Sequence, residues 1–229
     1  MFLWKAVVLP GVTVAFTDTR AGNLALHVGD NADDVRVRRA ELELNAAMVP
    51  GSLRFMNQVH GTAVAVMEAG SPDPEADAMV SRGVPLAVMV ADCIPAVLVG
   101  QAPGGRVLGA VHAGRPGLAA GVIPAAVERM RAMGAVNIQA WLGPSICGSC
   151  YEVPAGLRAD VAAAVPAAWS TTSWGTPGLD LPAGARSQLE AAGVDVMYCG
   201  PCTLENQDLF SYRRNKDTGR FAGLVWTHD

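Results

Sequence analysis

The sequence contains little charge and little histidine. Of its 229 residues, 17% are charged and 51% are hydrophobic, and histidine occurs only 4 times. This composition excludes wholesale disorder, because it supplies enough apolar side chains for a large core. The formal net charge is −4. With no overall positive field to attract phosphates, we expect no nucleic-acid partner.

Long uninterrupted apolar runs are also missing. The longest apolar stretch, residues 84–100, contains two prolines and Asp92, so it falls short of the about 20 apolar residues that cross a bilayer. The apolar segment after Lys5 stops at Pro10, too early for a secretory signal. We therefore expect a cytoplasmic protein with no membrane contact. Its 5 cysteines, an odd number, favour thiols and metal ligands over a disulfide framework.

The apolar segments predict an α+β fold in a single domain, residues 1–229, because no repeat, low-complexity tract or linker divides the chain. Leu86–Val111 predicts three strands in succession, so strands and helices do not alternate steadily and a doubly wound parallel sheet is disfavoured. The β-branched segments predict strands over Lys5–Leu9, Val12–Thr17, Leu24–Val28, Thr62–Met67, Leu86–Ala91, Ala96–Val99, Arg106–Val111, Val136–Trp141, Val194–Tyr198 and Phe221–Trp226.

Capping and breaker residues predict three helices. The first begins at Asn31 or Asp33 and runs to about Met48, the second runs from about Leu118 to Met133, and the third covers Ala155–Ala164. Pro124 is expected to kink the second helix or to mark its first turn. The segment from Ser170 to Gly178, rich in Ser, Thr, Gly and Pro, is expected to be a surface loop.

Two Cys-x-x-Cys pairs suggest redox or zinc chemistry, but the sequence argues against both. Cys199-Gly200-Pro201-Cys202 follows an apolar run as a thioredoxin active site does, yet a thioredoxin fold needs further strands and helices after this motif than the remaining chain provides. Joining this pair to Cys147-Gly148-Ser149-Cys150 would make a four-thiolate zinc site. The interval from Tyr151 to Tyr198 is far longer than the usual spacing of about 15–20 residues. We expect neither function.

Two histidines and one cysteine stand at the ends of apolar segments. His60 and His112 lie in polar, Gly-rich contexts, and Cys93 ends the most apolar predicted strand. Two imidazoles and a thiolate suit Zn²⁺, and three protein ligands leave a fourth position open to water or substrate. The residues alone leave three interpretations open. They are an open catalytic metal site, a cysteine nucleophile with a histidine base, and buried core residues without chemistry.

Motifs spread along most of the chain resemble the YfiH-like, laccase-domain family. In order, they are Asn57-Gln58-Val59-His60-Gly61, Ala76-Asp77-Ala78-Met79-Val80, Ala91-Asp92-Cys93-Ile94-Pro95, Val111-His112-Ala113-Gly114, Gly143-Pro144-Ser145-Ile146 with Cys150-Tyr151-Glu152-Val153, and Phe210-Ser211-Tyr212-Arg213-Arg214. The resemblance implies a layered fold of mixed β-sheets flanked by helices.

The resemblance also implies an activity and its metal. Family members are described as zinc-dependent purine nucleoside phosphorylases that accept adenosine, inosine, guanosine and methylthioadenosine, with an accompanying adenosine deaminase activity. The family's metal ligands correspond to His60, Cys93 and His112. The expected partners are therefore a purine nucleoside and phosphate. Copper is less expected than zinc, because multicopper oxidation needs a histidine-rich cluster that so few histidines cannot supply.

Site roles follow from the resemblance and from the needs of phosphorolysis. Catalytic roles are expected for Cys93, His60, His112, Asp92 and Arg115, and substrate binding for Asn57, Gln58 and Arg213. Arg115 or Arg213 would clamp phosphate, and Asp92 or Glu152 would protonate the purine. Asp92 has the alternative role of orienting a metal-bound histidine, and for Asn57 and Gln58 a turn role is an equal alternative.

Departures from the family pattern keep other classes of function open. The usual Gly-Trp-Arg-Gly after the second histidine is replaced by Gly114-Arg115-Pro116-Gly117, and a Gly-Gly-Val-Ser loop expected after Arg20 is missing. The family is also linked to editing of cell-wall precursors, and its fold is shared with a toxin whose Cys–His pair is hydrolytic. The alternatives are therefore a cysteine-type or metal-assisted hydrolase that edits cell-wall precursors, and a non-catalytic binding protein.

Overall fold

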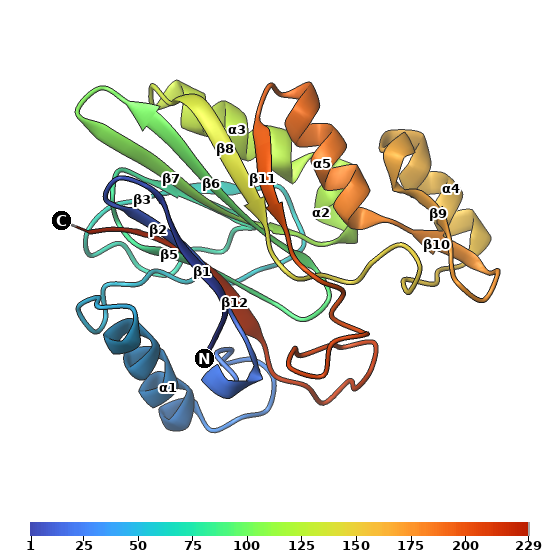
Figure 1. The fold of residues 1–229 in the computed structure, drawn as a ribbon, viewed down its shortest axis with the longest axis horizontal. Coiled ribbons are helices and arrows are strands. Elements are labelled where there is room, and N and C mark those ends of the chain that lie inside the picture. The colour runs from blue at the N-terminus through green and yellow to red at the C-terminus, as the bar shows by residue number, and fades with distance from the viewer. Residues whose placement is uncertain (229) are drawn as a thin grey trace.

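Two β-sheets stack face to face and carry helices on their outer faces (Figure 1). The computed structural model describes residues 1–228. The larger sheet has the strand order β11-β8-β6-β7-β4-β3, and the smaller one has the order β1-β2-β12-β5. The larger sheet consists of β3 (Val64–Met67), β4 (Ala78–Ser81), β6 (Ile94–Ala102), β7 (Gly105–Ala113), β8 (Val136–Leu142) and β11 (Asp195–Cys199). The smaller consists of β1 (Phe2–Leu9), β2 (Val12–Thr17), β5 (Leu86–Val90) and β12 (Phe221–Thr227).

Alternating side chains explain why two sheets stack. On a strand, successive residues point to opposite faces, and in β2 Val14 and Phe16 enter the core between the sheets while Ala15 packs on the helical side. In β6, Val97 faces the smaller sheet and Leu98 faces the helices. Both faces of these strands are buried, which accounts for their nearly continuous apolar sequence.

Helices cover the outer face of each sheet. α1 packs on the smaller sheet, and α2, α3 and α5 pack on the larger one (Figure 1). α4 lies beside the short hairpin of β9 (Trp169–Thr171) and β10 (Pro177–Leu179). Within residues 1–228, no helix is long and apolar enough to span a membrane. The helices are α1 (Ala32–Asn45), α2 (Arg115–Ala120), α3 (Val122–Ala132), α4 (Ala155–Ala164) and α5 (Leu181–Ala191), with 3₁₀ turns η1 (Thr19–Ala21) and η2 (Pro166–Ala168).

This architecture confirms the predicted α+β class and most of the strands. The predicted helix 118–133 is instead two helices, because Gly121 adopts a left-handed conformation (φ 91°) between α2 and α3. α5 was missed, since Pro182 and Gly184 weaken the helical pattern. β4 was also missed, and the expected surface loop 170–178 contains parts of β9 and β10.

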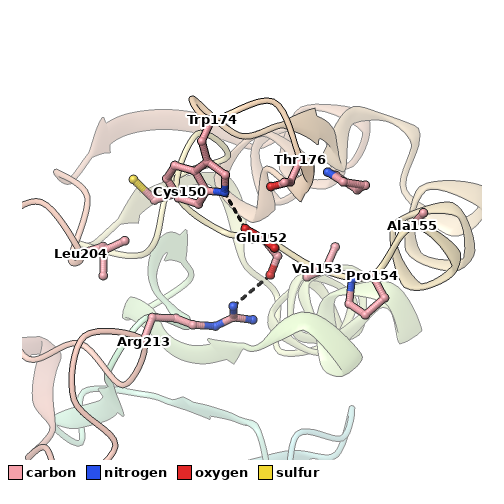
Figure 2. A pocket seen from close by; sticks show the side chains of 10 residues that line it. Cys150, Glu152, Val153, Pro154, Ala155, Trp174, Thr176, Leu204 and Arg213 are labelled. Carbon is pink, nitrogen blue, oxygen red and sulfur yellow. Dashed lines mark hydrogen bonds between the residues drawn. The ribbon is translucent and has the colours of Figure 1, made fainter.

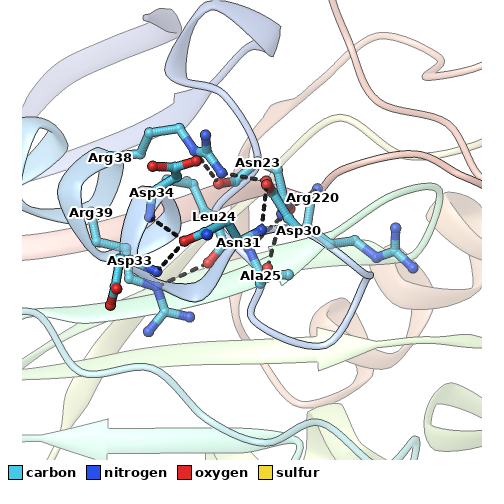
Figure 3. Close-up of polar contacts among 10 residues, drawn as sticks. All are labelled: Asn23, Leu24, Ala25, Asp30, Asn31, Asp33, Asp34, Arg38, Arg39 and Arg220. Atoms are coloured by element: carbon cyan, nitrogen blue, oxygen red, sulfur yellow. Dashed lines mark hydrogen bonds and ion pairs between the residues drawn. The ribbon is translucent and has the colours of Figure 1, made fainter.

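The prediction of a strand over Leu24–Val28 was wrong. The segment is a loop whose backbone is held by side chains, as Figure 3 shows. Asn23 accepts hydrogen bonds through Oδ1 from the backbone N–H groups of Ala25 (3.0 Å) and Arg220 (2.9 Å). From α1, Arg39 donates to the Leu24 carbonyl (2.9 Å). Local side-chain bonds of this kind replace a ladder partner, and they place His27 beside the pocket described below.

Candidate active site

Three segments bring His60, Cys93 and His112 together. His112 lies on β7, Cys93 lies in the turn that crosses from β5 in one sheet to β6 in the other, and His60 lies in the loop before β3. Their ligand atoms all lie within 4.8 Å of one another. The sulfur of Cys93 is 3.9 Å from His60 Nε2, and the two imidazole rings meet edge to face at 4.7 Å between centroids.

A buried carboxylate, Asp77, fixes this arrangement. Directly before β4, its Oδ1 accepts hydrogen bonds from His112 Nδ1 (2.7 Å) and from the His60 backbone N–H (2.9 Å). Its Oδ2 accepts from the Gly61 backbone N–H (2.6 Å). Because Nδ1 of His112 is engaged, Nε2 is left to face the other two ligands. A carboxylate behind a histidine in this way is typical of protein metal sites.

Gly114 leaves the space that the three ligands occupy. A Cβ atom at this position would lie 2.7 Å from the His60 ring, 3.2 Å from the Cys93 sulfur and 3.4 Å from the His112 ring. Any side chain here would displace His60. Gly114 directly precedes α2. The departure from the family pattern begins at the next residue, Arg115, so the glycine that gives His60, Cys93 and His112 their space is retained.

The chemistry of the donors fits a metal ion. Two imidazole nitrogens and a thiolate suit a borderline-soft cation, and a carboxylate orients one of the imidazoles. Without an ion, the same residues form a polarised pair. Burial raises the pKa of Cys93, but the charge of His112 and hydrogen bonds from both histidines outweigh it and lower that pKa to about 6. Burial lowers the pKa of His112, but Cys93 and Asp77 outweigh it and raise that pKa to about 9.

The three ligands open on a pocket of about 410 Å³. Its walls include Arg220, Tyr212 and the loop histidine His27. Burial, and then the charges of Arg220 and Arg39, lower the pKa of His27 and so favour the neutral form of this imidazole. The complete lining is His27, Gln58, His60, Met89, Val90, Ala91, Cys93, His112, Tyr212 and Arg220.

Asp92 and Arg115 lie on the other side of Cys93. With Tyr212 and Arg213 they line a smaller pocket of about 180 Å³ that shares Cys93 with the first. The buried Asp92 carboxylate accepts hydrogen bonds from Thr203 Oγ1 (2.5 Å) and from the Arg213 backbone N–H (2.7 Å). The contact to a metal-site histidine that was expected as the alternative for Asp92 is made by Asp77.

The predicted substrate-binding residues differ in their availability. Gln58 lines the pocket, but both ends of its amide bond the Met89 backbone, through Nε2 to the carbonyl (2.7 Å) and Oε1 to the N–H (3.0 Å). Gln58 therefore holds the strand β5, which forms one wall of the pocket. Asn57 is exposed and lies outside the pocket lining.

Arg213 and Glu152 meet in a third pocket of about 620 Å³ (Figure 2). Arg213 donates through Nη1 to the Glu152 backbone carbonyl (2.9 Å), and its guanidinium lies 4.7 Å from the Tyr151 ring centroid. The Glu152 carboxylate accepts from Trp174 Nε1 (2.5 Å). The structure therefore places Glu152 away from the lining of the pocket that contains the three ligands.

Four residues that sequence reasoning did not assign border this site: Asp77, His27, Tyr212 and Arg220. Asp77 and Tyr212 stood inside recognised motifs, and His27 and Arg220 stood in the segments Leu24–Asp30 and Thr218–Arg220, which extend the family resemblance; this was their only signal. His27 and Arg220 come from segments at opposite ends of the chain, which are joined by the Asn23 hydrogen bond. Nothing in the local sequence of either predicts that contact.

The fold and the site define a class of protein, an α+β domain in which two histidines and a cysteine form a candidate metal centre on an open pocket. The model of the family described as "Multi-copper polyphenol oxidoreductase laccase" matches residues 11–228. The chain belongs to this laccase-domain, YfiH-like family. Among curated relatives, the purine nucleoside phosphorylase ORF3 of Streptomyces griseus is 48% identical over 230 residues, covering 93% of each chain. The Escherichia coli K12 purine nucleoside phosphorylase YfiH is 39% identical over 212 residues, covering 89% of this chain and 85% of that one.

Solved structures share the fold. A Neisseria meningitidis protein superposes with a TM-score of 0.85 at 33% identity, covering 100% of this chain and 99% of that chain. YlmD from Geobacillus stearothermophilus also gives a TM-score of 0.85, at 28% identity, covering 98% and 94%. These matches confirm the family resemblance drawn from the motifs.

Replacing Asp77→Asn tests the role of the buried carboxylate. The amide keeps one acceptor but turns its NH₂ group toward backbone N–H groups. We expect affinity for added Zn²⁺ to fall about 10–100-fold, as for other residues that support metal ligands. Competition with a chromogenic chelator measures the affinity, and circular dichroism checks the fold. Asp160→Asn, on an exposed carboxylate of α4, is the control. Equal affinities in the two variants would contradict the assignment.

Replacing Gly114→Ala tests the close approach of the ligands. The added methyl overlaps the His60 ring, so we expect Zn²⁺ affinity to fall about tenfold or more in a protein that remains folded. The matched control is Gly156→Ala in α4, where an added Cβ has nothing within 4 Å. Isothermal titration with Zn²⁺ compares the two. An unchanged affinity in Gly114→Ala would show that the ligands do not need this space.

Alkylation of Cys93 tests the polarised pair. In metal-free protein, the thiolate persists down to the lowered pKa, so the iodoacetamide labelling rate is constant above about pH 7 and falls as the pH drops through about 6. Peptide mass spectrometry follows the residue. In His112→Ala, which removes the largest lowering influence, the midpoint moves upward. A wild-type midpoint near the ordinary value of 9.0 would contradict the geometry.

Proposed function

We propose that the protein is a zinc-dependent purine nucleoside phosphorylase. The observation that carries this proposal is the convergence of His60, Cys93 and His112 on one side of a pocket of about 410 Å³. The names of the curated relatives support the reaction. The substrates are proposed to be adenosine, inosine, guanosine or methylthioadenosine together with phosphate, and adenosine deamination is an accompanying activity to assay.

Phosphorolysis requires an anion holder and a support for the departing base. The bond between the sugar C1′ and the purine nitrogen breaks, a phosphate oxygen bonds to C1′, and the departing nitrogen gains a proton that balances the one lost by inorganic phosphate. A zinc ion on the three ligands supplies a positive centre for a phosphate or substrate oxygen. Arg220 adds a guanidinium on the same pocket, and planar guanidinium groups suit phosphate. Tyr212 provides a ring against which a purine packs.

The residues on the far side of Cys93 complete the proposal. Arg115 and Arg213 border the smaller pocket and provide positive charge for phosphate there. Asp92 already accepts two hydrogen bonds, from Thr203 and from the Arg213 backbone. We therefore assign it a positioning role, in which it holds the segment that carries Tyr212 and Arg213 against the turn containing Cys93.

Zinc fits this site better than the copper of the family's description. Two imidazoles and a thiolate are also found in type-1 copper centres, but multicopper oxidation needs a trinuclear cluster of many more imidazoles in addition. Among the described residues, the ligand group around Cys93 contains His60 and His112. His27 borders the pocket without joining that group, and His228 bonds Thr13 (2.9 Å). The set of two imidazoles and a thiolate matches catalytic zinc sites that keep one position open.

Phosphate-dependent release of free base tests the proposal. Metal-quantified wild type is incubated with adenosine, inosine, guanosine or methylthioadenosine, with and without phosphate, and products are resolved by chromatography. In Cys93→Ala we expect a loss of more than about 100-fold, since even residues that only support a metal ligand cost about 10–100-fold. Cys199→Ala, on an exposed cysteine, should retain activity. A folded, zinc-loaded wild type that releases no base would overturn the phosphorylase assignment.

One observation favours a second candidate, a cysteine hydrolase acting on cell-wall precursors. Cys93, His112 and Asp77 stand in the order nucleophile, base and orienting carboxylate, which is the arrangement of cysteine hydrolases. Metal removal separates the two functions. A hydrolase of this type cleaves cell-wall precursor peptides after chelation and is inactivated by alkylation of Cys93, whereas the phosphorylase loses activity on chelation.

A further inference from the structure

Three cysteines and a glutamate meet at a second place, outside the pocket of His60 and His112. β8 and β11 are parallel neighbours, so their carboxyl ends reach the same end of the sheet. The loops that follow them contain Cys147 and Cys150 in one case and Cys202 and Glu205 in the other. The three sulfur atoms and a carboxylate oxygen of Glu205 all lie within 4.8 Å of one another.

Backbone contacts hold these two loops in register. Ser145 forms a bridge with Cys202, in which the Ser145 N–H donates to the Pro201 carbonyl (3.3 Å) and the Thr203 N–H donates to the Ser145 carbonyl (3.1 Å). The loops also approach closely at Gly200, where a Cβ would lie 2.5 Å from the Pro144 nitrogen. The cluster is therefore set by the sheet and the main chain, and it does not rest on the side chains alone.

Two of the sulfur atoms, those of Cys147 and Cys202, accept hydrogen bonds from backbone N–H groups. The Cys147 backbone N–H donates to the Cys202 sulfur (3.4 Å), and the Ser149 backbone N–H donates to the Cys147 sulfur. The Cys150 thiol contacts Glu205 Oε1 (3.5 Å). All the cysteines are free thiols. Backbone N–H groups directed at sulfur favour the thiolate form that binds metal. Without an ion, burial and the neighbouring sulfurs outweigh these contacts and raise the pKa of Cys147 and Cys150, so a metal site here is indicated by the geometry of the four donors.

We propose that Cys147, Cys150, Cys202 and Glu205 bind a second, structural zinc ion. Three sulfurs and one carboxylate oxygen make four protein donors, the number that closes a tetrahedral structural site. Thiolates select zinc over magnesium or calcium, which prefer oxygen ligands. The proposal does not rest on the proposed phosphorylase activity, and the site shares no ligand with the group around Cys93.

The sequence prediction rejected a four-thiolate site on spacing, and the group in the structure has three thiols and a carboxylate. The long interval nevertheless does not keep the cysteines apart. The interval rule applies to ligands on adjacent hairpins, whereas here α4, the β9–β10 hairpin and α5 are inserted between β8 and β11. Because β8 and β11 pair in parallel, the loops that follow them lie side by side despite the long interval in sequence. Cys199, the fourth cysteine of the two pairs, does not belong to the proposed zinc site. It is exposed on β11, before the loop begins, and its sulfur lies 3.0 Å from Arg186 Nη2.

The second ion would brace the loops beside the first site. Cys202 is bonded to Thr203, whose hydroxyl donates to Asp92, which is bonded to Cys93. Arg214 strengthens the same loop by donating through Nη1 to the carbonyls of Thr203 (2.9 Å) and Leu204 (3.1 Å). Losing the ion frees the loop that carries Thr203, so the expected consequence is a lower melting temperature together with weaker positioning of Asp92.

Metal counting on matched cysteine variants tests the proposal. Full-length wild type, Cys202→Ser and Cys199→Ser are purified with Zn²⁺ under reducing conditions, and bound zinc is measured by mass spectrometry of the element. We expect Cys202→Ser to hold about one ion per chain fewer than wild type and to melt at a lower temperature, whereas Cys199→Ser matches wild type in both. Substituted Co²⁺ should lose most of its sulfur-to-metal absorption in Cys202→Ser and keep most of it in Cys93→Ala.

Wild-type protein provides a second measurement that needs no variant to fold. In zinc-loaded protein, Cys147, Cys150 and Cys202 should resist alkylation and become labelled after a chelator is added, while the exposed Cys199 is labelled in both states. Equal zinc content in Cys199→Ser and Cys202→Ser would overturn the proposal. So would a disulfide among the three cysteines that reductant, and not chelator, releases.

Discussion

The buried Asp77 carboxylate is the constraint on which the site depends. A buried charge is costly unless it is fully hydrogen-bonded, and Asp77 satisfies this by accepting from His112 on β7 and from the backbone at His60 and Gly61. These contacts join a strand of the larger sheet to a loop that has no strand partner of its own at His60. The relative positions of His60 and His112 are therefore set by the larger sheet, and a precise site requires support from rigid elements of this kind.

Two of the four residues other than glycine that have a positive φ in the described chain lie at this site. His60 and Asp92 both adopt positive φ values, 61° and 85°, which cost free energy for residues other than glycine and persist only where neighbours hold them. The Asp77 carboxylate holds His60 by accepting from the His60 backbone N–H. Thr203 and the Arg213 backbone hold Asp92 by donating to its carboxylate. The turn from β5 to β6 must pass from one sheet to the other, and the strained residue at Asp92 places Cys93 at that crossing.

The parts of the fold and site that could be predicted are those with a local signal. The apolar β-branched strand β2 was predicted to the residue and β7 to within two residues, and the three candidate ligands that the sequence singled out, His60, Cys93 and His112, lie together in the structure. The rest depended on contacts between distant segments. The loop at Leu24 resembles a strand until Asn23 and Arg39 bind its backbone. α5 contains Pro182 and Gly184 and is stabilised mainly by packing on the larger sheet. Asp77 and Asp92 are both acids beside apolar segments, and only β4–β7 pairing decides which one meets His112.

The two ligand groups are linked by a short physical path, and this makes the order of the second loop relevant to chemistry at the first. From Cys202 the path passes through Thr203, one hydrogen bond and Asp92 to Cys93. The Asp92 carboxylate also binds the Arg213 backbone, and Tyr212 next to it borders both pockets that share Cys93. A residue that is strained, buried and doubly hydrogen-bonded transmits small displacements of its partners, because a close-packed interior has few ways to absorb them. The loop after β11 is therefore a support for the pocket wall and for the turn that presents the thiolate.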